Sequence, residues 1–523
     1  MKKLCTLFLL AGFSLSLLSQ PLKTETDPKE ANEKFNQSNF EDALEDYLAL
    51  LDKEPRNEKY NYRAGVCYLN SNVNKAKAVP YLEIVTRVTK TEFDAWYLLG
   101  RAYQFAFRYD DAIKSFNSFK ALKKGKPENI ADTPRQIQYC INAKELMNFS
   151  VDMGFENLGP GVNSEYNDFY PFIPSDESFL VFNSRRPDGN EVRNPDGSFN
   201  SKVYISKVKD GIFMHAQPLG KLVAGKYDFE EVIGLSSKGD ILLLYAEYLD
   251  GNGDIFISYA DQSKNFKTAE KMPETVNSSK GSEIAASISA DGNTIYFASD
   301  RNGGHGGTDL YVSKKLPNGS WGPAQNLGPS INTSMDEDFP NISPDSKTLF
   351  FSSNGHTTMG GYDIFKAELD ASSGNFGQPK NLGFPINTSA DNMNFRISES
   401  GRYGYISALQ EKGLGDFDIY RVTFNEVEPE YTIFTGIVGV VGGKKVMNYA
   451  DVLITVTNVQ TQEIYGNYLP NPGTGRYVII LPPGEYELMV DAAGYSGAVE
   501  KINVLDKGSF VREVNKDIML SLK

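Results

Sequence analysis

Five polar side chains stand at matching points of a repeated sequence pattern and could together bind a ligand. Each lies eight residues before a turn of its copy, and the five are Asp168, Glu230, Glu283, Glu337 and Asn392. If rotation relates the copies, these side chains form a ring at the entrance to a central channel. Carboxylates in a ring repel one another unless a cation, a lysine side chain or local hydrogen-bond donors offset their charge. The pattern therefore predicts a channel mouth that receives a cation or a basic peptide.

The same spacing has a second explanation, in which the ring binds nothing. A carboxylate beside a turn often accepts hydrogen bonds from nearby backbone N–H groups and so holds the loop in place. One Asp in each later Gly-rich loop is expected to do the same, and these are Asp254, Asp309, Asp363 and Asp418. Both explanations of the ring stay open from the sequence.

The three histidines, His215, His305 and His356, give little support for a metal centre. His305 and His356 fall in corresponding loops of neighbouring copies, but no third ligand accompanies them at a metal-binding spacing. Motifs of Ser or Cys hydrolases, of zinc proteases and of P-loop proteins are absent from the sequence. We therefore expect no catalytic residue, no metal and no cofactor, and we predict that the protein is not an enzyme.

The elements that would position the ring are strands of a long repeat. Asn277, Asn332 and Asn387 are spaced by 55 residues, and each copy reads as short apolar runs separated by turns. Four strands in a unit of this length are typical of a propeller blade. The cues at Pro340 to Asp345 and at Gly360 to Phe365 resemble the TolB-type propeller repeat.

The number of blades can be argued from the ends of the repeat region. Five copies run from about 163 to 424, and the fifth lacks its last strand. The segment 149–159 carries the ending of such a strand before the first copy begins, so we expect it to complete the last blade and close the ring. The copy around 226–258 is the weakest, which leaves a six-bladed count open.

Residues 28–148 change to a helical period. Trp96, Leu99, Gly100, Tyr103 and Phe116 stand at spacings that resemble the tetratricopeptide repeat, in which small residues let two helices approach. Three such copies and a last amphipathic stretch predict a small α-solenoid. Its concave face would hold a peptide or a helix of another protein; the alternative is a rigid spacer packed on the propeller.

Residues 431–523 return to a strand pattern. The series from Gly475 to Tyr477, from Leu481 to Tyr486 and from Ala493 to Tyr495 resembles the carboxypeptidase regulatory-like domain, which implies a non-catalytic, transthyretin-like β-sandwich. The expected fold class is thus multidomain α plus all-β: an α-solenoid at 28–148, a five-bladed β-propeller at 149–425 and a β-sandwich at 431–523.

The first 19 residues and the composition point to an exported protein. Lys2 and Lys3 precede an apolar stretch that ends near Leu18, which predicts a signal peptide at 1–19 and a periplasmic location. A net charge of -14 argues against nucleic acid as a partner. Cys67 and Cys140 are expected to be buried hydrophobic residues, with a disulfide between them as the alternative.

The order of the three modules resembles the PorE-like envelope proteins of the Bacteroidota. That resemblance implies a non-enzymatic scaffold at the outer membrane, in type IX secretion or related envelope assembly, with other envelope or secretion proteins as partners. We expect no transmembrane segment, and no peptidoglycan binding because the family's OmpA-type domain is not found. The alternative function is a propeller that binds a glycan or a peptide.

Overall fold

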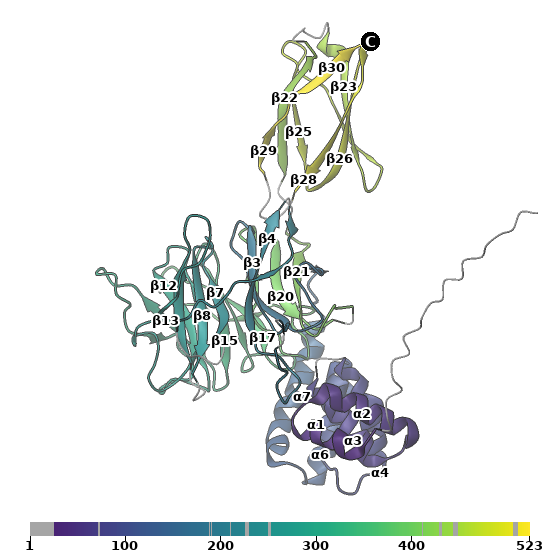
Figure 1. Ribbon diagram of the computed structural model, residues 1–523, viewed down its shortest axis with the longest axis vertical. Helices are drawn as coiled ribbons and strands as arrows, with labels where there is room; N and C mark the ends of the chain where they lie inside the picture. The colour runs from purple at the N-terminus through teal and green to yellow at the C-terminus, as the bar shows by residue number, and fades with distance from the viewer. Residues whose placement is uncertain are drawn as a thin grey trace, which may run out of the picture.

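The computed structural model describes residues 26–71, 74–187, 189, 191–209, 211–224, 230–248, 253–410, 412–427, 431–442, 448–505 and 511–523. The predicted signal peptide lies outside the described residues. Figure 1 shows the helices at one end of the molecule, a group of sheets in the middle and two further sheets at the other end, where the C-terminus lies. Within the described ranges, no helix combines the length and the apolar character needed to cross a membrane.

Helices form the first part of the described chain, and each packs against its neighbours in sequence. Glycines allow the close approach: a Cβ on Gly65 would lie 2.6 Å from Leu82, and one on Gly100 would lie 2.5 Å from Phe116. The elements are α1 (Pro28–Asn36), α2 (Phe40–Lys53), α3 (Glu58–Asn70), the 3-10 helix η1 (Lys75–Ala78), α4 (Val79–Val88), α5 (Ala95–Phe105), α6 (Tyr109–Leu122) and α7 (Pro127–Met147).

The expected fold class, with its tetratricopeptide α-solenoid and its transthyretin-like β-sandwich as separate modules, is wrong. Among the described residues, more lie in strands than in helices, and there are only seven α-helices. The physical reason lies in what the spacing can specify. Small and aromatic residues at helical spacing are needed wherever two helices approach closely, so they predict helix pairs and not one repeat family.

Five sheets make up the propeller in the middle of the molecule. Every blade starts from an inner strand, and its strands pair in antiparallel order. The blades are β2 (Asp168–Phe172), β3 (Phe179–Ser184), β4 (Lys202–Lys209), β5 (Ile212–Phe213) and β6 (Gln217–Pro218); β7 (Glu230–Leu235), β8 (Ile241–Glu247), β9 (Gly253–Tyr259) and β10 (Glu270–Lys271); β11 (Glu283–Ile288), β12 (Thr294–Ser299), β13 (Asp309–Lys314) and β14 (Gln325–Asn326); β15 (Glu337–Ile342), β16 (Thr348–Ser353), β17 (Asp363–Glu368) and β18 (Lys380–Asn381); and β19 (Arg396–Ile397), β20 (Tyr403–Ala408), β21 (Asp418–Phe424) and β1 (Met153–Asn157).

The strand before the first copy closes the propeller. β1 pairs antiparallel with β21, from Met153 opposite Phe424 to Asn157 opposite Tyr420. The closure inferred from the sequence is therefore confirmed. It covers the outer edge of the last blade and joins both ends of the propeller in one sheet.

The last part of the chain forms two facing sheets that share one apolar core. Alternate residues of β26 point inward, among them Tyr486, Leu488 and Val490, as the period of a half-buried strand requires. The elements are β22 (Thr432–Val440), η2 (Tyr449–Asp451), β23 (Val452–Asn458), β24 (Ile464–Tyr468), β25 (Arg476–Leu481), β26 (Gly484–Ala492), β27 (Tyr495–Ser496), β28 (Ala498–Val504), β29 (Glu513–Asn515) and β30 (Ile518–Leu522). The domain boundaries proposed from the sequence stay predictions.

Candidate functional site

The helices are fixed to one end of the propeller by buried contacts. Asn142 on α7 donates a hydrogen bond from Nδ2 to the carbonyl oxygen of Thr358 at 2.9 Å, and the Tyr139 hydroxyl donates to the carbonyl oxygen of Asn354 at 2.8 Å. Met359, from the same propeller loop, is fully buried in the core of the helices. These contacts hold the helices at a set distance from the blades.

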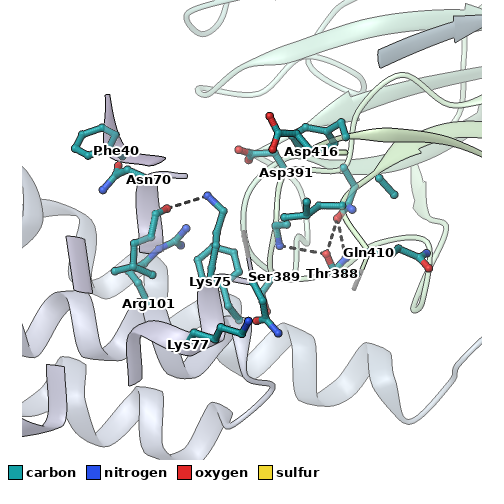
Figure 2. Close-up of a pocket in the computed structure, with 18 of the residues that line it drawn as sticks. Phe40, Asn70, Lys75, Lys77, Arg101, Thr388, Ser389, Asp391, Gln410 and Asp416 are labelled. Carbon is teal, nitrogen blue, oxygen red and sulfur yellow. Dashed lines mark hydrogen bonds between the residues drawn. The ribbon is translucent and has the colours of Figure 1, made fainter. Parts of the chain in front are cut away.

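A cleft lies beside this junction, between the helices and the propeller. It has a volume of about 1540 Å³. Its helix wall comes from residues between Phe35 and Asn129, and its propeller wall from residues between Phe155 and Phe417. Figure 2 shows Lys75, Lys77 and Arg101 on the helix side of the cleft and Asp391 and Asp416 on the propeller side.

Aromatic rings line both walls of the cleft. Tyr62 and Tyr97 stand on the helix wall, and Phe169 and Tyr170 stand on the propeller wall. The Tyr97 hydroxyl donates to Asp132 at 2.6 Å, which holds its ring in place. Ring faces of this kind are flat, apolar and slightly negative, so they accept C–H edges and cations from a ligand.

Charge is unevenly divided between the two walls. The lining contains seven basic residues, namely Lys59, Arg63, Lys75, Lys77, Arg101, Lys126 and Arg185, against four acidic ones, namely Glu92, Asp94, Asp391 and Asp416. Burial and the nearby Arg101 guanidinium lower the pKa of Lys75, whereas Asp391 across the cleft acts to raise it. The cleft thus has an excess of positive charge in a chain whose net charge is -14.

The floor of the cleft reaches the inner strands of the propeller. Tyr170 on β2 and Phe339 on β15 both have positive φ angles, of 53° and 47°, where each strand shifts its register. The bulges aim the two rings at each other, and their centroids are 4.4 Å apart. Burial raises the pKa of Tyr170, and the charges of Glu231 and Asp338, which follow Glu230 and Glu337 in the sequence, raise it further.

Glu231 and Asp338 do not line the cleft, but their pKa values are themselves raised. Burial raises the pKa of Asp338 to about 7, and the Asp338 carboxylate accepts a hydrogen bond from the backbone N–H of Phe339 at 2.7 Å. Burial also raises the pKa of Glu231. Perturbed carboxyl groups are common at functional sites and also in structural networks.

Each of the five ring residues begins an inner strand or lies just before one. Their side chains form hydrogen bonds with nearby residues of the chain. Glu337 accepts hydrogen bonds from the backbone N–H and the hydroxyl of Thr333, at 2.7 and 2.8 Å. Glu283 accepts from the backbone N–H of Ser278 at 2.8 Å and pairs with Arg301 at 2.8 Å. Asp168 accepts a corresponding hydrogen bond from the backbone N–H of Ser164, and Asn392 accepts one from that of Thr388. Glu230 accepts hydrogen bonds from the backbone N–H groups of Leu222 and Val223.

Of the five ring residues, only Asn392 lies in the lining of the cleft. The binding role of Asp168, Glu230, Glu283, Glu337 and Asn392 stays a prediction. The cleft itself was missed by sequence reasoning because it needs two distant segments side by side. The feature of the sequence that could have indicated the cleft was the aromatic content of the helices, which we assigned to helix packing.

The histidines and cysteines do not build a centre of their own. Nε2 of His356 lies 2.8 Å from the carbonyl oxygen of Ile331. Across the described ranges, no group of three or more His, Cys, Asp or Glu side chains is placed to hold a metal ion. Cys67 and Cys140 are free and buried.

The sequence matches no known family model, and no curated protein matches it. Solved structures do match. A thermostable family-43 glycoside hydrolase has 16% identity and a TM-score of 0.33, over 50% of this chain and 90% of its own. A family-43 arabinoxylan arabinofuranohydrolase from Bacillus subtilis has 11% identity and a TM-score of 0.34, over 66% and 96%. A β-1,2-mannobiose phosphorylase from Listeria innocua has 11% identity and a TM-score of 0.34, over 53% and 98%.

These matches correct the functional reading of the sequence. Their names are those of enzymes that act on glycans, and not of PorE-like envelope proteins with tetratricopeptide repeats. The expected non-enzymatic scaffold of type IX secretion is therefore wrong, as is the prediction that the protein is not an enzyme. The resemblance to the PorE-like proteins was based on the order of three common modules. The order of modules does not determine the chemistry of a site. At these identities the likeness concerns the fold alone.

Proposed function

We propose that the protein binds an acidic oligosaccharide in the cleft between the helices and the propeller. The observation that carries the proposal is the lining: aromatic rings on both walls, with hydrogen-bonding side chains and an excess of basic groups between them. Sugar rings present C–H faces that stack on aromatic side chains, and their hydroxyl groups need planar amide, carboxylate and guanidinium partners. Carboxylates on the sugar favour the basic helix wall.

Several side chains of the cleft are available for such contacts. Tyr62 is partly exposed on the helix wall, and Lys77 is exposed beside it. On the propeller wall, Gln410 is exposed, and the Arg185 guanidinium lies 6.0 Å from the centroid of the Phe169 ring. A ligand that bridged both walls would therefore meet stacking and polar partners at once.

Calorimetric titration of the whole protein tests the proposal, with an oligogalacturonate and a neutral xylo-oligosaccharide of equal length as probes. We expect the acidic sugar to bind more tightly, with an affinity that falls as salt rises. Tyr62→Ala and Lys77→Glu should each weaken binding, about tenfold or more. Tyr259→Ala is the matched control, because Tyr259 is 42% exposed outside the cleft. Failure of both sugars to bind, or binding of peptides alone, would overturn the proposal.

Cleavage of the bound sugar is a second candidate function, which two carboxyl groups that act on Tyr170 of the cleft lining support. Hydrolysis of a glycosidic bond uses two carboxyl groups, one of which keeps its proton near neutral pH. Asp338, with its pKa of about 7, and Glu231 both lie close enough to Tyr170 to act on its ionisation. Chromatography of sugars incubated with the protein tests this candidate: shortened products that Asp338→Asn abolishes support it, and intact sugars exclude it.

A further inference from the structure

One level of the propeller interior lies four residues beyond the ring on every inner strand. It consists of Phe172, Gly234, Ser287, Asn341 and Arg396, which pair in equivalent register with Val181, Leu243, Tyr296, Phe350 and Tyr405. Because the registers match, the five residues occupy the same depth between the blades. Only Arg396 brings a charge to this level.

The Arg396 side chain is enclosed by the inner strands of the two neighbouring blades. It is 5% exposed, and its guanidinium lies 4.3 Å from the centroid of the Phe172 ring. Nη1 donates a hydrogen bond to the carbonyl oxygen of Pro340 at 3.3 Å. Nε and Nη2 are buried and have no hydrogen-bond partner among the described residues. The N–H groups at Nε and Nη2 are therefore unused, although the guanidinium is buried.

Arg396 also lacks the compensating carboxylate that other arginines of the propeller have. Arg186 pairs with Asp168 at 2.5 Å, Arg301 pairs with Glu283 at 2.8 Å, and Arg421 pairs with Glu156. Burial alone lowers the pKa of Arg396 to about 9, and no charged group in the described chain offsets it. A buried, unpaired charge is among the costliest arrangements in a protein.

A second unpaired polar side chain lies on the same segment, two residues earlier. Asn394 is fully buried, and neither its Oδ1 nor its Nδ2 has a partner within the described part of the chain. Native interiors rarely leave so many polar atoms without partners, and such groups commonly mark a bound ion or water. The two residues together indicate an interior site with an occupant.

We propose that a small inorganic anion, of the size of chloride, binds beside Arg396 in the interior of the propeller. It would accept hydrogen bonds from Nε and Nη2 and neutralise the guanidinium. A water molecule would accept hydrogen bonds from these donors but would leave the guanidinium charge uncompensated. The low exposure of Arg396 favours a small ion over an organic carboxylate. This site is separate from the cleft, since Arg396 is not part of the cleft lining.

Crystals of the whole protein grown in sodium bromide give the direct test. We expect an anomalous peak within hydrogen-bond distance of Nε and Nη2 of Arg396. A water molecule there, with no anomalous signal, would overturn the proposal. The wild-type chain suffices for this measurement, so it does not depend on any variant folding.

Unfolding in chloride or in gluconate, at equal ionic strength, gives an independent test. Once chloride exceeds its dissociation constant, each further tenfold increase should lower the unfolding equilibrium constant about tenfold. Arg396→Met should lose this dependence, whereas Lys347→Met, at an exposed blade turn, should keep it. If Arg396→Met stabilises the protein equally in both salts and the wild type does not respond to chloride, the guanidinium is merely unpaired and the proposal fails.

Discussion

Asn142 and Thr358 are 216 residues apart in the sequence, and they are joined by one buried hydrogen bond between the last helix and the fourth blade. The donor is the Nδ2 of Asn142, and the acceptor is the carbonyl oxygen of Thr358 at 2.9 Å. The bond fixes the helices to the propeller at the edge of the cleft. The shape of the cleft therefore depends on a contact between two parts of the chain that are far apart in the sequence.

Removal of this bond should loosen the junction. Asn142→Ala leaves the Thr358 carbonyl buried without a donor, which costs about 1–3 kcal/mol of the free energy of unfolding. Urea denaturation measures the loss, and calorimetry should show weaker binding in the cleft. Lys144→Ala is the control on the same helix, because its ion pair with Asp110 is exposed and contributes little. Equal stability of both variants would contradict the role of the junction.

Close helix packing at Gly100 should make a larger residue unfavourable there. Alanine gains about 1 kcal/mol of helix propensity over glycine. The new Cβ, however, would lie 2.5 Å from the ring of Phe116, which is fully buried. Overpacking of this kind costs about 1–3 kcal/mol, so Gly100→Ala should lower the free energy of unfolding. Gly154→Ala, whose Cβ would meet nothing within 4 Å, should have little effect.

The buried carboxyl group of Asp338 should make stability depend on pH. Its pKa is raised to about 7 from 3.8, so the folded state holds the proton more tightly than the unfolded state. This contribution is full below the unfolded pKa and is lost as the pH rises through about 7. Between the two values, the free energy of unfolding should fall by about 1.4 kcal/mol per pH unit.

Denaturation at several pH values from 4 to 8 checks this effect, with Asp338→Asn expected to flatten the curve. Asp345→Asn is the opposite control: hydrogen bonding to Ser343 lowers the pKa of Asp345 from 3.8, so that residue should add little slope above about pH 5. A slope unchanged in Asp338→Asn would show that another group carries the proton.

The ring residues should be needed for folding if their loop contacts are their main role. Glu337→Gln replaces an oxygen acceptor by an amide that faces the donors of Thr333 and Ser353. We expect a loss of about 1–3 kcal/mol in the free energy of unfolding, whereas Glu274→Gln, on an exposed loop, should change nothing. Normal stability of Glu337→Gln, with a ligand no longer bound, would instead support the channel mouth predicted from the sequence.

The two cysteines of the helices should be unreactive in the folded protein. Burial raises the pKa of Cys67 to about 12 and that of Cys140 to about 11, and both thiols are enclosed. Alkylation at pH 8, mapped by mass spectrometry, should modify neither residue before denaturant is added and both afterwards. A pair that stays unmodified in denaturant until a reductant is added would indicate a disulfide.

Sequence by itself determined the local elements and the propeller repeat. The spacing of Asn277, Asn332 and Asn387 marks the blades because each Asn side chain bonds the backbone of the third strand of the preceding blade, as Asn332 does to Leu310. The pairing of β1 with β21 also followed from sequence. The last copy lacks its fourth strand, and the segment before the first copy carries the ending of such a strand, so each supplies what the other lacks. Gly65 and Gly100 likewise marked helix contacts, though not the fold family.

Only the tertiary structure decided the cleft and the interior of the propeller. The charge of Asp391 acts on the pKa of Lys75 across the cleft, yet no pattern in either segment refers to the other. Arg396 reads in the sequence as an ordinary strand residue, and its burial without a carboxylate depends on Phe172 and Pro340 from neighbouring blades. Periodicity reports which face of an element is buried, whereas the chemistry of a site depends on which elements meet there.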